Sequence, residues 1–222
     1  MTETLQTPQI KICGLTRVTE ARACVALGAS AIGCVFYPPS PRNLSLLEAR
    51  RICESLPPAA VTVGVFVDAA FDQIMQAVKF CSLKAVQLHG RESKELIDRL
   101  TQEKLTVIKA LFSTRPPFLA DADHFGASAY LAEYGQGRMP GGNAEKWNWR
   151  EASDRIQSHP FILAGGLSPE NVAAAISISE PDAVDVSSGV ESAPGQKDLE
   201  RVKTFIHEVS RHRLQRNIRR IF

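Results

Sequence analysis

The stretch VTVGVFVDAAFDQIMQAVKFCSLKAVQL, residues 61–88, indicates how this chain folds. Residues 61–67 form a short run rich in valine, which favours a β-strand. Residues 71–80 then place apolar side chains at helical spacing, and residues 85–88 return to a short apolar run. Strand, helix and strand in this order form a βαβ unit, from which parallel sheets are built.

The same alternation extends toward both ends of the chain. Eight strands are predicted, at residues 9–13, 31–36, 61–67, 85–88, 106–110, 128–132, 161–164 and 183–186. Their apolar runs are too continuous for one face to meet water, which favours a parallel sheet covered by helices. Eight strands in about 200 residues favour a closed α/β fold, the (β/α)₈ TIM barrel, over an open doubly wound sheet.

Capping signals mark two of the helices between these strands. Ser45 and Glu48 predict a capping box at the start of a helix over residues 46–56. After the seventh strand, Ser168 is the predicted N-cap and Pro169 the first helical residue of an alanine-rich helix. Further helices are predicted at residues 71–80 and 93–100.

Composition predicts one cytoplasmic domain spanning residues 1–222. The length of 222 residues and the hydrophobic share of 44% suit a single large core. The five cysteines contain no C-x-x-C pair and are predicted to be reduced thiols. The N-terminus has no signal-peptide pattern, and no apolar run reaches the length of a membrane span, so no membrane partner is expected.

A basic extension is predicted at about residues 211–222. Its five arginines have no acidic neighbour, and removing their charges from the net charge of +2 leaves −3, so the body of the protein disfavours nucleic acid. Leu214, Ile218 and Ile221 stand at helical spacing, which predicts a solvated or half-packed extension of the last helix. Contact of this extension with RNA or an acidic partner is the alternative.

Six motifs lie in or directly after the predicted strands, in chain order, toward the ends where barrels of this kind carry their chemistry. They are KICGLT at 11–16, FYPPSPRN at 36–43, GVFV at 64–67, VQLHG at 86–90, AGGL at 164–167 and DVSSGVE at 185–191. Together they resemble the phosphoribosylanthranilate isomerase family over residues 9 to about 205. The resemblance implies an Amadori rearrangement of a sugar phosphate in tryptophan biosynthesis, no metal or organic cofactor, and a monomer or homodimer.

The chain departs from the family after the sixth strand. The family usually has an aspartate there, followed by Gly-Gly-Thr-Gly and Phe-Asp-Trp, whereas this chain has Glu133, then GGNA at 141–144 and WNW at 147–149. The reaction needs an acid to protonate the ring oxygen and a base to take the proton from C2′. Since the carboxyl group is kept, Glu133 is the predicted acid, and Asp185 or a water molecule is the alternative.

Cys13 is the predicted base. A thiolate is the reactive form of cysteine, and Cys13 stands at the end of the first strand directly before Gly14. A cysteine in an apolar strand is by itself more often a small hydrophobic residue, and the resemblance supplies the functional interpretation.

Four further side chains at strand ends are predicted to bind substrate. By resemblance Arg42, in a proline-braced loop, would bind the anthranilate carboxylate through its planar fork, although a loop arginine is otherwise often solvated. Gln87, His89 and Asp185 stand at the ends of the fourth and eighth strands, and His89 could equally be structural. Asp68 is left open between a helix cap and a pocket wall.

Two turns are predicted to bind phosphate. Glycine and serine let backbone N–H groups approach an anion, and barrels commonly bind phosphate after strands seven and eight. The residues concerned are Gly165, Gly166, Ser188 and Gly189.

Three alternatives remain open at this stage. The isomerase of histidine biosynthesis on the same fold would use two aspartates, and Cys13 argues against it. Indole-glycerol-phosphate synthase would need catalytic lysines, for which Lys11 and Lys109 are available. The third is a catalytically weak barrel that binds a sugar phosphate as a regulator or scaffold, which the altered loop after the sixth strand would suit.

Overall fold

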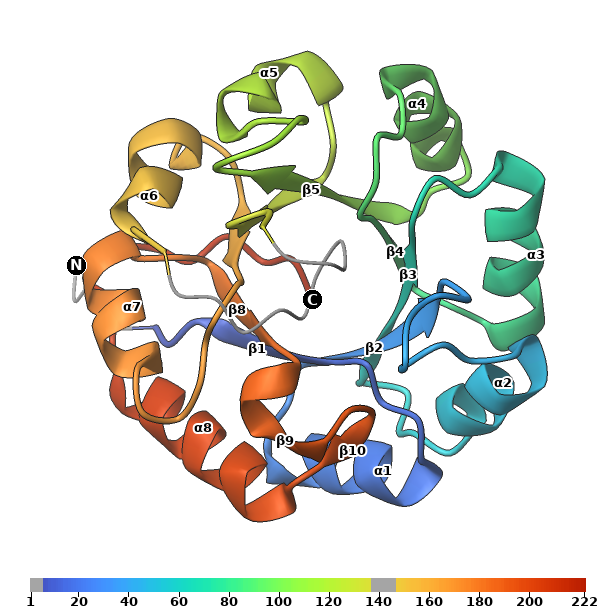
Figure 1. The fold of residues 1–222 in the computed structure, drawn as a ribbon, viewed down its shortest axis with the longest axis horizontal. Helices are drawn as coiled ribbons and strands as arrows, with labels where there is room; N and C mark the ends of the chain where they lie inside the picture. The colour runs from blue at the N-terminus through green and yellow to red at the C-terminus, as the bar shows by residue number, and fades with distance from the viewer. Residues whose placement is uncertain (1–5, 137–146) are drawn as a thin grey trace.

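The computed structural model describes residues 6–136 and 147–222 and contains a closed barrel of eight parallel strands (Figure 1). Each strand pairs with its neighbours in sequence, and the first strand closes the ring on the eighth. The strands are β1 Gln9–Cys13, β2 Ala31–Phe36, β3 Val61–Phe66, β4 Ala85–Leu88, β5 Thr106–Phe112, β6 Ala129–Glu133, β7 Phe161–Leu163 and β8 Ala183–Val186. The predicted fold and all eight strands are confirmed, with ends that differ by two residues at most.

The helices form a ring outside the strands (Figure 1). They are α1 Val18–Leu27, α2 Leu46–Glu54, α3 Phe71–Cys81, α4 Lys94–Gln102, α5 Ala122–Phe125, α6 Arg150–Ile156, α7 Val172–Ser179 and α8 Leu199–Arg211. Two short 3₁₀ turns, η1 Leu119–Asp121 and η2 Ser188–Val190, and a small hairpin of β9 Glu191–Ala193 and β10 Gln196–Lys197 complete the described elements. None of the described helices is long and apolar enough to cross a membrane.

Successive side chains along each strand point alternately outward, into the core between strands and helices, and inward, into the core inside the barrel. On β1, Ile10 and Ile12 belong to the large core between strands and helices, whereas Lys11 and Cys13 face the barrel interior. The lower interior is filled mainly by small and aliphatic side chains, including Ala31, Val63 and Ile162. Because both faces of the strands are covered, the continuous apolar runs of the sequence are explained.

The capping box predicted for α2 is present. The Ser45 hydroxyl accepts a hydrogen bond from the backbone of Glu48, and the Glu48 carboxylate accepts one from the backbone of Ser45. The prediction of Ser168 as the N-cap of α7 was wrong, because α7 begins at Val172 with Asn171 as its cap. The Asn171 side chain bonds Ser168 N at 2.8 Å and Gly166 O at 2.8 Å, which holds residues 168–171 in a turn before the helix.

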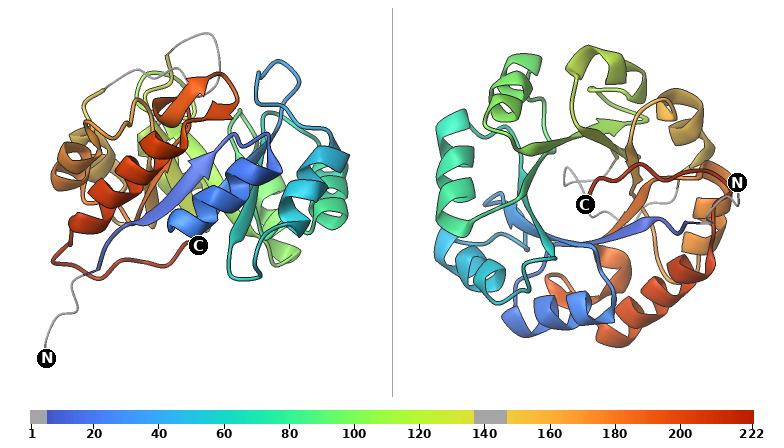
Figure 2. Two further views of the ribbon diagram at one scale, coloured as in Figure 1. Left: turned by 90° about the horizontal axis from the view of Figure 1, so that it is seen from below. Right: turned by 180° about the vertical axis from the view of Figure 1, so that it is seen from behind.

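The basic extension is not a continuation of α8, and that prediction was wrong. α8 ends at Arg211, and the following residues run beneath the barrel to its central axis (Figure 2). Arg216 and Arg219 pair with the fully buried carboxylate of Asp182, each at 2.8 Å. The Gln9 side chain accepts from the backbone of residues 221 and 222, and Phe222 joins the apolar interior. The pairing of the buried Asp182 carboxylate with these two arginines therefore decides the path of the extension, and the helical spacing of its apolar residues does not.

Candidate active site

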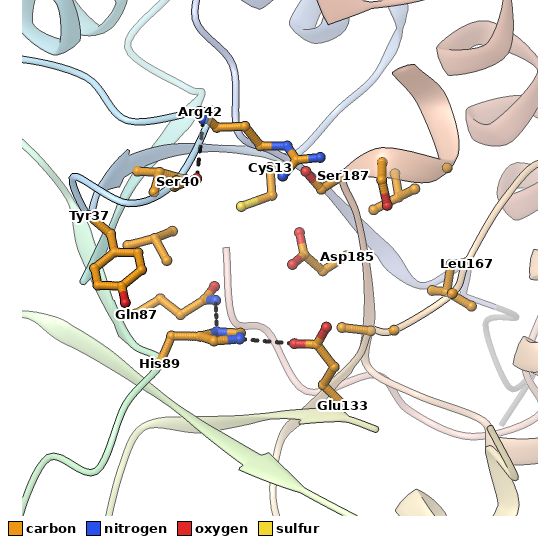
Figure 3. Close-up of a pocket in the computed structure, with 18 of the residues that line it drawn as sticks. Cys13, Tyr37, Ser40, Arg42, Gln87, His89, Glu133, Leu167, Asp185 and Ser187 are labelled. Carbon is orange, nitrogen blue, oxygen red and sulfur yellow. Dashed lines mark hydrogen bonds and ion pairs between the residues drawn. The ribbon is translucent and has the colours of Figure 1, made fainter. Parts of the chain in front are cut away.

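A pocket opens at the C-terminal ends of the barrel strands (Figure 3). About 750 Å³ of space, including the part open to solvent at the mouth, lies between its walls. All ten residues that the sequence analysis selected line it: Cys13, Arg42, Gln87, His89, Glu133, Gly165, Gly166, Asp185, Ser188 and Gly189. Their convergence from the ends of six strands, β1, β2, β4, β6, β7 and β8, follows from the parallel, closed arrangement of the sheet.

Cys13 is the last residue of β1 and is 8% exposed. Gly14 has φ +73 and turns the chain there, and a side chain at Gly14 would collide with Arg42. Burial raises the pKa of the Cys13 thiol, while the positive charge of Lys11 opposes that rise. The other four cysteines lie outside the pocket, in or against the core between strands and helices, as predicted.

Glu133 enters the pocket from the end of β6 and is held by a chain of hydrogen bonds (Figure 3). The Gln87 amide nitrogen lies 2.9 Å from His89 Nδ1, and His89 Nε2 lies 2.9 Å from Glu133 Oε2. An amide nitrogen can only donate, so the ring hydrogen is on Nε2 and is donated to Glu133. Gln87 Oε1 is buried and has no hydrogen-bond partner among the residues that the structure describes, so it can accept from a ligand.

Arg42 reaches the pocket from the loop after β2 and is buried, not solvated. Its Nε and Nη2 atoms donate to the two carboxylate oxygens of Glu191 at 2.8 and 2.6 Å. Lys197 Nζ donates to the same carboxylate at 2.7 Å. Burial would raise the pKa of Glu191, but the two cations outweigh it and keep that pKa low. The Nε and Nη2 edge of the guanidinium is therefore bound to Glu191, and a ligand carboxylate can accept hydrogen bonds only from the remaining N–H groups.

The glycine turns after β7 and β8 also line the pocket. Gly165 and Gly166 have φ values of +81 and +68, which L side chains rarely adopt. Gly165 also packs closely, because an added Cβ would lie 3.0 Å from Trp147 Nε1 and 3.1 Å from Glu133 Cγ. A side chain at Gly189 would collide with the carbonyl oxygen of Leu167, so this glycine is needed for the turn itself.

Several pocket features were not found from the sequence. Val35, Val65 and Tyr37 pack beside Cys13 as an apolar wall, and nothing in their local pattern distinguishes them from core residues. Glu191 lies in the DVSSGVE motif, and its pairing with Arg42 leaves no local signal in the sequence. Asp68 proves to be neither a helix cap nor a pocket residue, since its carboxylate accepts from the backbone of Arg91 at 2.6 Å.

The altered loop after β6 is described only in part. Residues 141–144, which carry GGNA, lie outside the described residues. Trp147 is buried and donates its indole N–H to Ala164 O at 3.0 Å, beside the first glycine turn. Among the described residues, no group of three or more His, Cys, Asp or Glu side chains is arranged to hold a metal ion.

Comparison with protein families gives a match over most of the chain. A family model described as N-(5'phosphoribosyl)anthranilate (PRA) isomerase matches residues 10–208. A curated N-(5'-phosphoribosyl)anthranilate isomerase from Desulfatibacillum aliphaticivorans is 47% identical over 214 residues, which cover 96% of this chain and 98% of that protein.

Solved structures agree with this match. Phosphoribosyl anthranilate isomerase from Thermotoga maritima superimposes with a TM-score of 0.82 at 39% identity, covering 91% of this chain and 98% of that one. A complex of such an isomerase with reduced 1-(o-carboxyphenylamino)-1-deoxyribulose 5-phosphate has a TM-score of 0.79 at 38% identity, with the same two coverages. A further structure shows monomers generated from the isomerase of Thermotoga maritima, which is described as dimeric. Its TM-score is 0.79 at 37% identity, and it covers 91% of this chain and 98% of that one.

Proposed function

The chain belongs to the N-(5'-phosphoribosyl)anthranilate isomerase family, and from this premise we propose that Cys13 and Glu133 are the base and the acid of its reaction. The enzyme is an aldose–ketose isomerase of tryptophan biosynthesis. It converts N-(5-phospho-β-D-ribosyl)anthranilate into 1-(2-carboxyphenylamino)-1-deoxy-D-ribulose 5-phosphate by an Amadori rearrangement. The observation that carries the proposal is that a thiol and a carboxyl group face one pocket between a buried arginine and two glycine turns.

Glu133 opens the sugar ring in this proposal. With Oε2 accepting from His89, the other carboxyl oxygen is left to carry a proton to the furanose oxygen. The C1′–O bond then breaks, and the nitrogen lone pair forms the C1′=N bond of a protonated Schiff base. His89 acts as a positioning residue, and Gln87 Oε1 accepts a hydrogen bond from a substrate hydroxyl or amine.

Cys13 performs the second step as the thiolate. It takes the proton from C2′, the C2′–H electron pair becomes the C1′=C2′ bond, and the iminium pair returns to nitrogen. The resulting enolamine tautomerises to the ketone. Asp185 lies between Cys13 and Glu133 (Figure 3), where it can accept a hydrogen bond from a substrate hydroxyl or the amine.

The protein holds the substrate by the anionic group at each of its two ends. Arg42 binds the anthranilate carboxylate through the N–H groups that Glu191 leaves available. The backbone of Gly165, Gly166, Ser188 and Gly189 binds the phosphate. Fixing both ends places C1′ and C2′ between acid and base, which is the arrangement that a rearrangement without cofactor requires.

The regulatory alternative rested on the altered loop after β6. Glu133 keeps a carboxyl group in the pocket with a positioning partner, which favours an active enzyme. A turnover assay that follows the fluorescence of the anthranilate group separates the two functions. Turnover that depends on both Cys13 and Glu133 supports the proposal, and binding of substrate without turnover would favour the regulator.

Organisation and location complete the proposal. We infer that the chain works as one barrel domain over residues 1–222, as a monomer or homodimer, and the dimeric Thermotoga maritima relative favours the homodimer. The five free cysteines favour the reducing environment of the cytoplasm.

A further inference from the structure

Lys11 is a buried lysine that the reaction described above does not use. Its side chain is 0% exposed, and it points into the barrel between the apolar lower interior and the pocket. Lys11 stands opposite Asp185 in the pairing of β1 with β8, and its Nζ lies 2.9 Å from Asp185 Oδ1. Burying an ammonium group is costly, so a lysine at this depth needs compensating negative charge.

Lys11 and Cys13 share one side of the strand. Residues two apart on a strand point the same way, so the side chains of Lys11 and Cys13 both lie on the barrel-interior side of β1. The ammonium interacts with both the Asp185 carboxylate and the Cys13 thiol. Burial lowers the pKa of Lys11, but these two neighbours more than reverse that effect, so Lys11 remains charged.

We propose that Lys11 is a positioning residue whose buried ammonium is the counter-charge of the Cys13 thiolate during proton abstraction, an inference that rests on the proposed function. The thiol proton leaves to water before substrate binds, and the thiolate then accepts the proton from C2′. Lys11 gives up no proton in either step. Without it, the thiolate would share a buried site with the Asp185 carboxylate, and the cations left near it, Arg42 and Lys197, are bound to Glu191.

Two other cations lie near Cys13, but both are bound to the carboxylate of Glu191. Arg42 and Lys197 both interact with the Cys13 sulfur through their charge, and both are bound to Glu191. The groups that face Cys13 are Lys11 of β1, Cys34 of β2, Arg42 of the following loop, Asp185 of β8 and Lys197 of β10. Of the three cations, Lys11 is the one whose charge most strongly opposes the rise in the pKa of Cys13.

A matched pair of variants tests the inference. Residue 185 is neutral in both variants, so they differ only in the charge at residue 11. Asp185→Asn is compared with Lys11→Met/Asp185→Asn, in which both members of the buried pair become neutral, a replacement that folds usually tolerate. The rate of Cys13 alkylation by iodoacetamide is measured against pH, with Cys13→Ala as the background for the other four thiols. The midpoint should be about 1 to 3 pH units higher in the double variant than in Asp185→Asn. Equal midpoints would overturn the inference.

A second measurement uses the unaltered enzyme and does not depend on the folding of a variant. The ¹³Cε signal of Lys11 should keep its ammonium position through the pH range in which Cys13 titrates, and should show an inflection at the Cys13 midpoint. A signal without that inflection, or a loss of the Lys11 proton there, contradicts the inference. Failure of the proposed function is recognised separately, because Cys13→Ala would then turn over normally whatever the Lys11 titration shows.

Discussion

Replacing Glu133 by glutamine tests the assignment of the acid. The change preserves the size of the side chain and leaves an oxygen to accept the hydrogen bond of His89, now 2.9 Å from Oε2, so the pocket should keep its shape. It removes the only proton that the group can give to the ring oxygen. We expect kcat to fall at least about 10²-fold, or about 2.7 kcal/mol in the barrier, with a modest change in KM.

Glu133→Asp adds a geometric test. Shortening the side chain by one methylene moves the carboxyl group by about 1 Å and stretches the His89 contact to about 4 Å, beyond hydrogen-bond distance. This variant should therefore be slower than the natural enzyme, although it carries the residue that the family usually has.

The assay is the fluorescence of the anthranilate group, followed from pH 5 to 9, with thermal denaturation as the check on folding. Glu95→Gln, a change of an exposed carboxylate on α4, is the control and should leave kcat unaltered. Full activity of Glu133→Gln across the whole pH range would refute the reasoning and transfer the role to Asp185 or a water molecule.

Four further outcomes are expected. Cys13→Ala should lower turnover at least about 10²-fold and leave the thermal midpoint nearly unchanged, and near-normal turnover would remove Cys13 from the mechanism. Arg42→Lys should raise KM more than it lowers kcat, because a lysine cannot bind Glu191 at two points and still meet the substrate; an unchanged KM would place the anthranilate group elsewhere. Gly166→Ala should weaken the binding of substrate and of inorganic phosphate together in equilibrium titrations, whereas a loss of stability with phosphate affinity intact would make this glycine a turn residue only. Asp182→Asn should lower the free energy of unfolding by about 2 kcal/mol in urea denaturation, since its two arginine partners are partly exposed. Burial raises the pKa of Asp182, but hydrogen bonds from the two arginines outweigh burial and lower that pKa. The contribution of Asp182 to the free energy of unfolding is therefore complete above about pH 3.9, the pKa of an unfolded aspartate, and is lost as the pH falls toward the lower pKa of the folded protein. An equal loss of stability on acidification in Asp182→Asn would contradict this assignment.

The sequence predicted the barrel well because each strand is buried on both faces and therefore leaves a continuous apolar run. It failed where a distant partner decides the local conformation. The basic extension has helical spacing, yet the buried carboxylate of Asp182, about 35 residues earlier, draws it beneath the barrel. Ser168 has the composition of an N-cap, yet the side chain of Asn171 closes a turn over it.

In the active site, too, local motifs were predicted from the sequence, whereas contacts between distant residues were not. Residues in motifs at strand ends, such as Cys13 and His89, were found because parallel strands bring their C-terminal ends together. The partners that set their properties were not found. Glu191 contacts Arg42 across 149 residues of sequence, and Lys11 contacts Asp185 across 174, so no local pattern reports either pair.

The closure of β1 on β8 also has a consequence for biosynthesis. One edge of β1 can pair as soon as β2 is made, but its other edge must wait for a strand 174 residues later. At ordinary rates of translation the nascent chain carries that open edge for roughly 10 to 35 s. Cys13 lies on the first strand of this seam and Asp185 on the last, so the active site is assembled only when the ring closes.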